Sequence, residues 1–101
     1  MALDSVVLDR YVMDVLMRDL VGHDRSPSAF LVYLAIKAAT RNGPALLSHA
    51  ALAERTGLSK RACQNAIELL RGRGLIEVSR KHGTEPARYR PLQPWKSNRH
   101  V

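Results

Sequence analysis

The sequence predicts a mainly α-helical fold that ends in a small β-hairpin. Between about residues 4 and 71, apolar residues recur at spacings of three or four, as on the buried face of a helix. From Ile76 onward they alternate with polar residues, as in a half-buried strand. The chain has 101 residues, a length that suits one domain.

The first predicted helix covers about residues 4–21, and residues 22–25 are expected to break it. Its main apolar face carries Leu8, Val12, Leu16 and Leu20. Because other apolar residues widen this surface beyond the single stripe of a surface helix, a second buried contact is expected. Two interpretations stay open: these four residues contact a second copy of the chain, or the helix is wedged between two parts of its own domain. The helix and the break form a first unit, residues 1–25.

The second predicted helix begins at Ser26-Pro27. Ser26 can cap free backbone N–H groups, and proline suits the first turn of a helix. The sequence Asn42-Gly43-Pro44 ends this helix, because glycine tolerates a positive φ and proline cannot continue the helix. The apolar run at residues 45–47 could form a small strand.

Two shorter helices follow. Ser48 can cap a helix over about residues 49–55, which stops at Thr56-Gly57, and Ser59 can cap another that runs to about Arg71. Strands are then predicted over residues 76–79 and 87–90, joined by a turn at residues 81–84. Residues 26–95 thus form the main domain, and residues 96–101 a frayed tail.

Positive charge is concentrated in the second half of the chain. The formal net charge is +7, and only five of the 16 Lys and Arg residues precede residue 55. Such asymmetry indicates a polyanionic partner for the C-terminal half. No apolar run approaches the ~20 residues of a membrane span. With one cysteine and no signal-like start, we expect a cytoplasmic location.

Residues 47–70, LSHAALAERTGLSKRACQNAIELL, resemble the bacterial helix-turn-helix unit. Ala53 is small where two crossing helices must approach, and Gly57 lies in the turn, where a left-handed backbone is cheap without a Cβ. The following residues, RGRGLIEV, resemble the entry to the hairpin of a winged helix-turn-helix domain. The resemblance spans about residues 26–92, and the first helix is an addition to it. It implies that the helix after Ser59 reads duplex DNA.

The candidate DNA-binding residues fall into two groups. Arg or Lys can donate to guanine, Gln or Asn can pair with adenine, and Glu can accept from cytosine. The outward face of the helix after Ser59 offers these types, while the hairpin offers residues suited to phosphate. The helix group is Ser59, Lys60, Arg61, Gln64, Asn65 and Glu68; the hairpin group is Arg80, Lys81, His82, Thr84 and Arg88.

The leading hypothesis is a transcriptional regulator that binds duplex DNA as a homodimer. A replication or partition protein of a plasmid or phage, and a winged helix that binds protein, are alternatives. The sequence shows no spacing of metal ligands, phosphate loop or catalytic set, so no enzyme, cofactor or metal is expected. Cys63 has the helical phase of a core residue rather than a redox switch.

Overall fold

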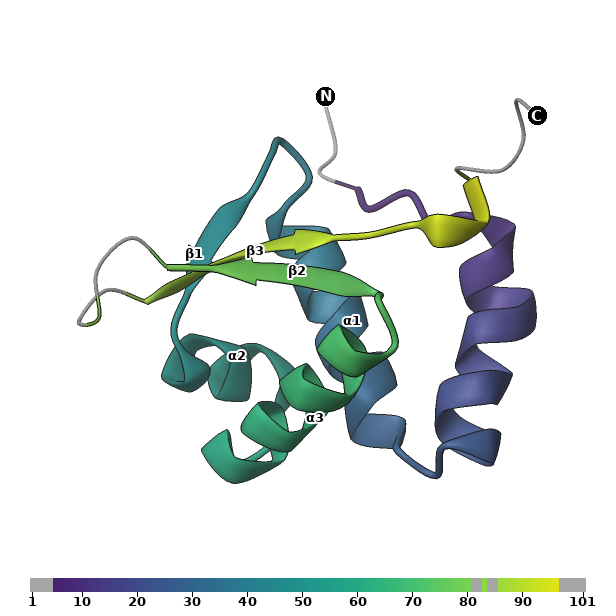
Figure 1. The fold of residues 1–101 in the computed structure, drawn as a ribbon, viewed down its shortest axis with the longest axis horizontal. Helices are drawn as coiled ribbons and strands as arrows, with labels where there is room; N and C mark the ends of the chain where they lie inside the picture. Colours follow the sequence, from purple (N-terminus) through teal and green to yellow (C-terminus); the bar gives the residue numbers. More distant parts are fainter. Residues whose placement is uncertain (1–4, 81–82, 84–85, 97–101) are drawn as a thin grey trace.

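Helix α1 (Pro27–Ala39) lies at the centre of the fold (Figure 1). The computed structural model describes residues 5–80, 83 and 86–96. The N-terminal helix lies on one side of α1, and α2 and α3 lie on the other. A three-stranded sheet also packs against α1 through its middle strand. One hydrophobic core joins all these elements.

The N-terminal helix spans residues 10–23 and is wound as a π-helix over η1 (Val12–Leu16) and η2 (Asp19–His23). It begins later than the sequence predicted, because the Asp9 carboxylate accepts a hydrogen bond from the Tyr11 N–H at 3.1 Å and supports the first turn there. The break predicted over residues 22–25 falls in the second half of that range. The helix continues through Gly22, and the chain turns at Arg25, whose φ is +53°.

Burial of the N-terminal helix corrects the expected contact with a second copy. Val12, Leu16 and Leu20 are 0%, 2% and 0% exposed within the single chain. Leu8 is half-buried and packs against the same core. Val12, Leu16 and Leu20 are therefore covered by their own domain and present no surface to a second chain, whereas Leu8 is only partly covered. Of the two interpretations, the helix wedged within its own domain agrees with this burial. The spacing of apolar residues predicts a buried face, but it does not show which surface covers that face.

Serine caps begin the next three helices, as the sequence predicted. Ser26 Oγ accepts from Ala29 N–H at 3.2 Å and begins α1. Ser48 does the same for α2 (His49–Thr56), and Ser59 for α3 (Lys60–Gly72), each at 3.0 Å. Between α2 and α3, Gly57 has a φ of +79°, so the tight turn uses a backbone conformation that favours glycine.

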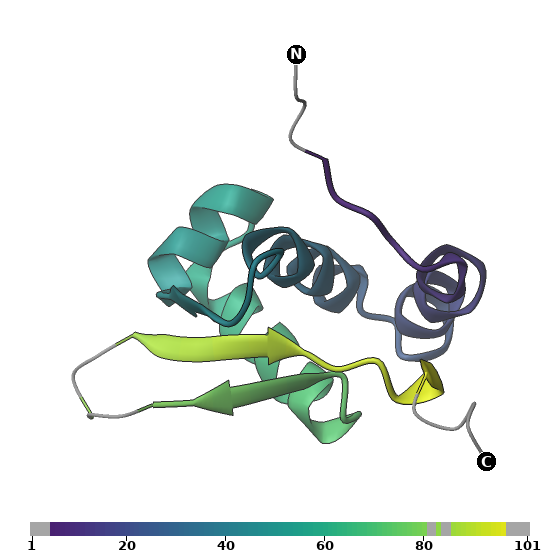
Figure 2. The same ribbon diagram turned by 90° about the horizontal axis from the view of Figure 1, so that it is seen from above.

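The sheet contains the predicted hairpin and one further strand. Strands β2 (Ile76–Ser79) and β3 (Ala87–Pro91) pair antiparallel, with Val78 opposite Tyr89 (Figure 2). The short run β1 (Ala45–Leu47) also pairs antiparallel with β3, which gives the order β1-β3-β2. Because strand side chains alternate, Ala87 and Tyr89 enter the core while Arg90 remains exposed.

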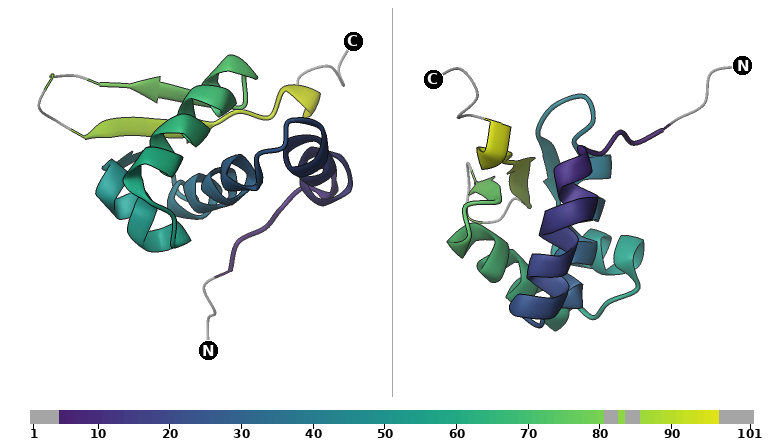
Figure 3. Two further views of the ribbon diagram at one scale, coloured as in Figure 1. Left: turned by 90° about the horizontal axis from the view of Figure 1, so that it is seen from below. Right: turned by 90° about the vertical axis from the view of Figure 1, so that its right-hand side faces the viewer.

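After β3 the chain crosses to the N-terminal helix (Figure 3). The Tyr33 hydroxyl donates to the Leu92 carbonyl at 3.3 Å, and burial raises the pKa of Tyr33 to about 12. In the short turn η3 (Pro94–Lys96), Trp95 stacks on Tyr11. The residues after β3 therefore hold the N-terminal helix against the rest of the domain.

Candidate nucleic-acid interface

The outward face of α3 has the exposure that the sequence predicted. Its buried face packs Cys63, Ala66, Ile67 and Leu70 into the core. This burial fixes the rotation of the helix about its axis, so the opposite face points to solvent. All six helix residues expected to contact DNA are exposed: Ser59, Lys60, Arg61, Gln64, Asn65 and Glu68.

Two of these six side chains take part in contacts within α3. The Ser59 hydroxyl oxygen is committed to the helix cap, where it accepts from Ala62 N–H. The Glu68 carboxylate accepts from the Arg71 guanidinium at 3.4 Å, one turn along the helix. Arg71 was not among the expected site residues, although its spacing from Glu68 places it on the same helix face.

The Gln64 side chain contacts a residue of a different helix. Its Nε2 atom lies 3.2 Å from Nδ1 of His49, the first residue of α2. Sequence reasoning missed His49 because the two residues are 15 positions apart and only the packing of α2 on α3 brings them together. His49 is half-buried, whereas Gln64 is exposed.

A groove of about 300 Å³ separates α3 from the hairpin. Its charged residues are Glu68 and Arg71 from α3 and Arg80, which follows β2. Tyr89 of β3 lines its floor, and burial raises the pKa of that tyrosine. Of the predicted helix group, the fold therefore brings Glu68 to this groove, together with Arg80 from the hairpin group.

The structure describes only some of the remaining residues of the hairpin group. Arg88 is half-buried on β3, where it lies opposite both Leu46 and Ser79. The expected contacts of Lys81, His82 and Thr84 lie outside the described residues. On the hairpin, the site as described therefore depends on Arg80 and Arg88.

Arg73 points to the N-terminal helix, although it is only two residues from Arg71. Its guanidinium forms ion pairs with Asp24 and, at 3.4 Å, with Asp19. A hydrogen bond from His23, and then the charge of Arg73, hold the pKa of Asp24 below its ordinary value against the opposing effect of burial. The positive charge of Arg73 therefore helps to hold the N-terminal helix in place.

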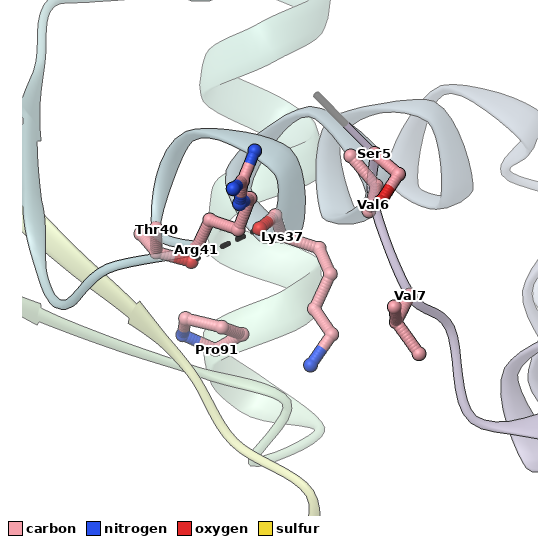
Figure 4. A pocket seen from close by; sticks show the side chains of 7 residues that line it. All are labelled: Ser5, Val6, Val7, Lys37, Thr40, Arg41 and Pro91. Carbon is pink, nitrogen blue, oxygen red and sulfur yellow. Dashed lines mark hydrogen bonds between the residues drawn. The ribbon is translucent and has the colours of Figure 1, made fainter. Parts of the chain in front are cut away.

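Figure 4 shows a second concave surface, which is lined by no residue of α2 or α3. This cavity of about 370 Å³ is formed by residues 5–7, the end of α1 and Pro91. Desolvation, followed by repulsion from Lys96, lowers the pKa of its Lys37. Thr40 Oγ1 donates to the Ile36 and Lys37 carbonyls, so that hydroxyl completes the end of α1.

The described residues offer no group of three or more His, Cys, Asp or Glu side chains that could hold a metal ion. Cys63 is fully buried, with its sulfur 3.8 Å from Thr56 Oγ1. Within the same part of the chain, every helix is too short or too polar to cross a membrane.

The order of elements, α1-β1-α2-α3 followed by the β2–β3 hairpin, is that of a winged helix-turn-helix domain. A family model described as a helix-turn-helix domain matches residues 26–76, which is half of the chain. The protein belongs to this helix-turn-helix domain family. No curated protein and no solved structure matches the chain. The family indicates DNA binding, and α3 has the position of the second helix in the helix-turn-helix unit.

Proposed function

We propose that this protein binds specific sequences in duplex DNA and regulates transcription as a homodimer. The observation that carries the proposal is the row of exposed polar side chains along one face of α3. A recognition helix enters the major groove with the residues near its N-terminus against the base edges. Lys60, Arg61 and Gln64 lie in the first turns of α3, where such contacts are made. A role in transcription would place the protein in the cytoplasm and requires no catalytic step.

The residue types support a division of labour across this interface. Lys60 and Arg61 can donate to guanine, and Gln64 and Asn65 can pair with adenine. Arg80, on the other side of the groove from α3, suits phosphate contacts that position the protein without reading sequence. Lys60, Arg61 and Arg80 are exposed and contribute to the excess positive charge of the second half of the chain.

An exposed apolar stripe supports the homodimer. Met13, Met17 and Val21 recur every four residues along the N-terminal helix and are 45%, 37% and 38% exposed. Because the N-terminal helix lies on the side of α1 away from α2, a second copy there would leave the recognition helices uncovered (Figure 1). Asp14 and Arg18 are also exposed on this helix, where the Asp14 carboxylate accepts a hydrogen bond from the Arg10 guanidinium at 3.2 Å.

Selection of bound duplexes from a random DNA pool tests the function. We expect an enriched palindrome whose half-sites are about 10 base pairs, or one helical turn, apart. Affinity for that site should fall with salt with a log–log slope of roughly −0.9 for each phosphate neutralised. Failure of the folded protein to bind any duplex in dilute buffer would refute the proposal. A flat salt dependence would point to a protein partner instead.

The dimer surface is tested separately by light scattering after size-exclusion chromatography. Met17→Asp should convert the dimer to a folded monomer, because it places a charge in the centre of the stripe. Leu46→Asp is the matched control, since Leu46 is 50% exposed but lies on β1. A dimer that survives Met17→Asp would remove the N-terminal helix from the interface.

A further inference from the structure

Gln64 differs from its neighbours on the exposed face of α3, because its side chain contacts a residue of another element. Among the described residues, no side chain of another element bonds to Lys60, Arg61 or Asn65, whereas His49 contacts Gln64 at 3.2 Å. His49 belongs to α2, whose own position is fixed by the buried Leu52. A rigid neighbouring helix therefore limits the orientations of one DNA-facing side chain.

The chemistry of the contact determines which atoms remain for DNA. Gln64 Nε2 can only donate, so His49 Nδ1 must accept, which requires a neutral imidazole with its proton on Nε2. The second N–H of Gln64 and its Oε1 atom then remain available to contact DNA. One donor and one acceptor in the plane of an amide are what the N7 and N6 edge of adenine requires.

We propose that His49 is a specificity-determining positioning residue, which orients the Gln64 carboxamide to read adenine. This inference rests on the proposed function. An exposed glutamine samples several rotamers, and fixing one of them upon binding opposes association. Because His49 restrains the amide before DNA arrives, less of this freedom is lost when Gln64 meets its base.

The same contact makes the preference for adenine depend on pH. Histidine is the side chain that ordinarily changes charge between pH 5 and 8. Protonation turns Nδ1 into a donor, which breaks its bond to Gln64 Nε2 and attracts Oε1, the acceptor that adenine needs. Four titratable or charged groups share the groove with His49: Glu68 and Arg71 of α3, Arg80 after β2 and Tyr89 of β3.

The test measures affinity for the selected duplex and for duplexes with one base pair replaced, each by fluorescence anisotropy. Gln64→Ala should lower the preference at one A·T pair by about tenfold, the loss of one bidentate contact. His49→Ala should lower the preference at the same pair by about threefold, as expected for one hydrogen bond. The double variant should be no worse than Gln64→Ala. Circular dichroism checks that each variant is folded.

A pH series separates positioning from a merely structural role. Between pH 7.5 and 5.5, the wild-type preference at that pair should fall about threefold, whereas His49→Ala should show a constant preference. His49→Gln supplies a carbonyl acceptor that does not titrate, so it should restore the preference at both pH values. The ratio of two affinities cancels pH effects common to all DNA.

Three results would overturn the inference while leaving the proposed function intact. The first is that His49→Ala weakens all duplexes alike and leaves the preference at the Gln64 pair unchanged. The second is a double variant whose loss is the sum of the two single losses. The third is a wild-type preference that does not change with pH. Absence of binding to any duplex by the wild-type protein would instead refute the proposed function.

Discussion

The indole of Trp95 stacks on the phenol ring of Tyr11, with ring centroids 4.5 Å apart and 16° between the planes. Trp95 Nε1 also donates to the Asp9 carboxylate at 3.3 Å, at the start of the N-terminal helix. These contacts join residues that are more than 80 positions apart in the sequence. The end of the chain is therefore part of what holds the N-terminal helix in place.

Removing the indole should destabilise the whole domain. We expect Trp95→Ala to lower the free energy of unfolding by about 2 kcal/mol, because both the stacking and the apolar burial are lost. Urea denaturation followed by circular dichroism measures this loss. Trp95→Phe keeps a ring but removes the donor to Asp9, so it should cost less. Equal stability of wild type and Trp95→Ala would show that the stacking contributes nothing.

Acid should weaken the attachment of the N-terminal helix through Asp24. The pKa of Asp24 is lowered in the folded protein by His23 and then Arg73. Its stabilising effect is therefore complete above the ordinary value of 3.8 and is lost as the pH falls through the lower folded pKa. Asp24→Asn should be less stable than wild type at pH 7, and the difference should shrink by pH 2. A difference that is constant over this range in urea denaturation would contradict the assignment.

Neighbouring positions on the N-terminal helix should respond very differently to truncation. Leu16 is 2% exposed, and Leu16→Ala should lower the free energy of unfolding by about 3 kcal/mol through lost burial and the cavity that remains. Met17 is 37% exposed, and Met17→Ala should change it by less than about 0.5 kcal/mol in the monomer. The comparison requires protein dilute enough to be monomeric. Similar losses at both positions would contradict the observed rotation of this helix.

The turn between α2 and α3 should require glycine because of its backbone conformation, and not because a side chain would clash with other atoms. A Cβ at Gly57 would meet no atom within 4 Å, but the φ of +79° is strained for other residues. We therefore expect Gly57→Ala to cost about 1–2 kcal/mol in thermal unfolding. Gly72 at the end of α3 also has open space and lacks the positive φ, so Gly72→Ala is the control and should be neutral or stabilising. A neutral Gly57→Ala would disprove the strain argument.

Arg61 on α3 and Arg80 after β2 should have separable effects on DNA binding. If Arg61 reads a base, Arg61→Ala should lose about 1–3 kcal/mol of discrimination at one base pair. If Arg80 contacts phosphate, Arg80→Ala should weaken all duplexes alike and reduce the salt slope by about one phosphate. Titration of a panel of duplexes at several salt concentrations measures both. Identical behaviour of the two variants would rule out the division between reading and positioning.

Local features of the fold could be read directly from the chain. Ser26, Ser48 and Ser59 are followed by helices because a serine oxygen caps free N–H groups within three residues, a purely local interaction. The phase of Cys63 predicted its burial, and the same phase predicted the exposed face of α3. Each of these inferences uses neighbours within one or two turns of helix.

Other features required the tertiary structure. The spacing of Val12, Leu16 and Leu20 predicts a buried face, but periodicity does not reveal whether the covering surface is the same chain or another. Arg71 and Arg73 look alike in the sequence, yet one lines the groove and the other pairs with Asp24. Such outcomes depend on residues from elements distant in sequence.

By itself the sequence determined the starts of α1, α2 and α3, the hairpin, the exposed face of α3 and the family-like turn at Gly57, because capping, periodicity and backbone preference act over a few residues. Only the tertiary structure decided that the N-terminal helix packs into the core, that β1 joins the sheet and that His49 meets Gln64. Those contacts join segments far apart along the chain. The packing of the whole domain determines which residues form these contacts, and local sequence patterns carry no information about that packing.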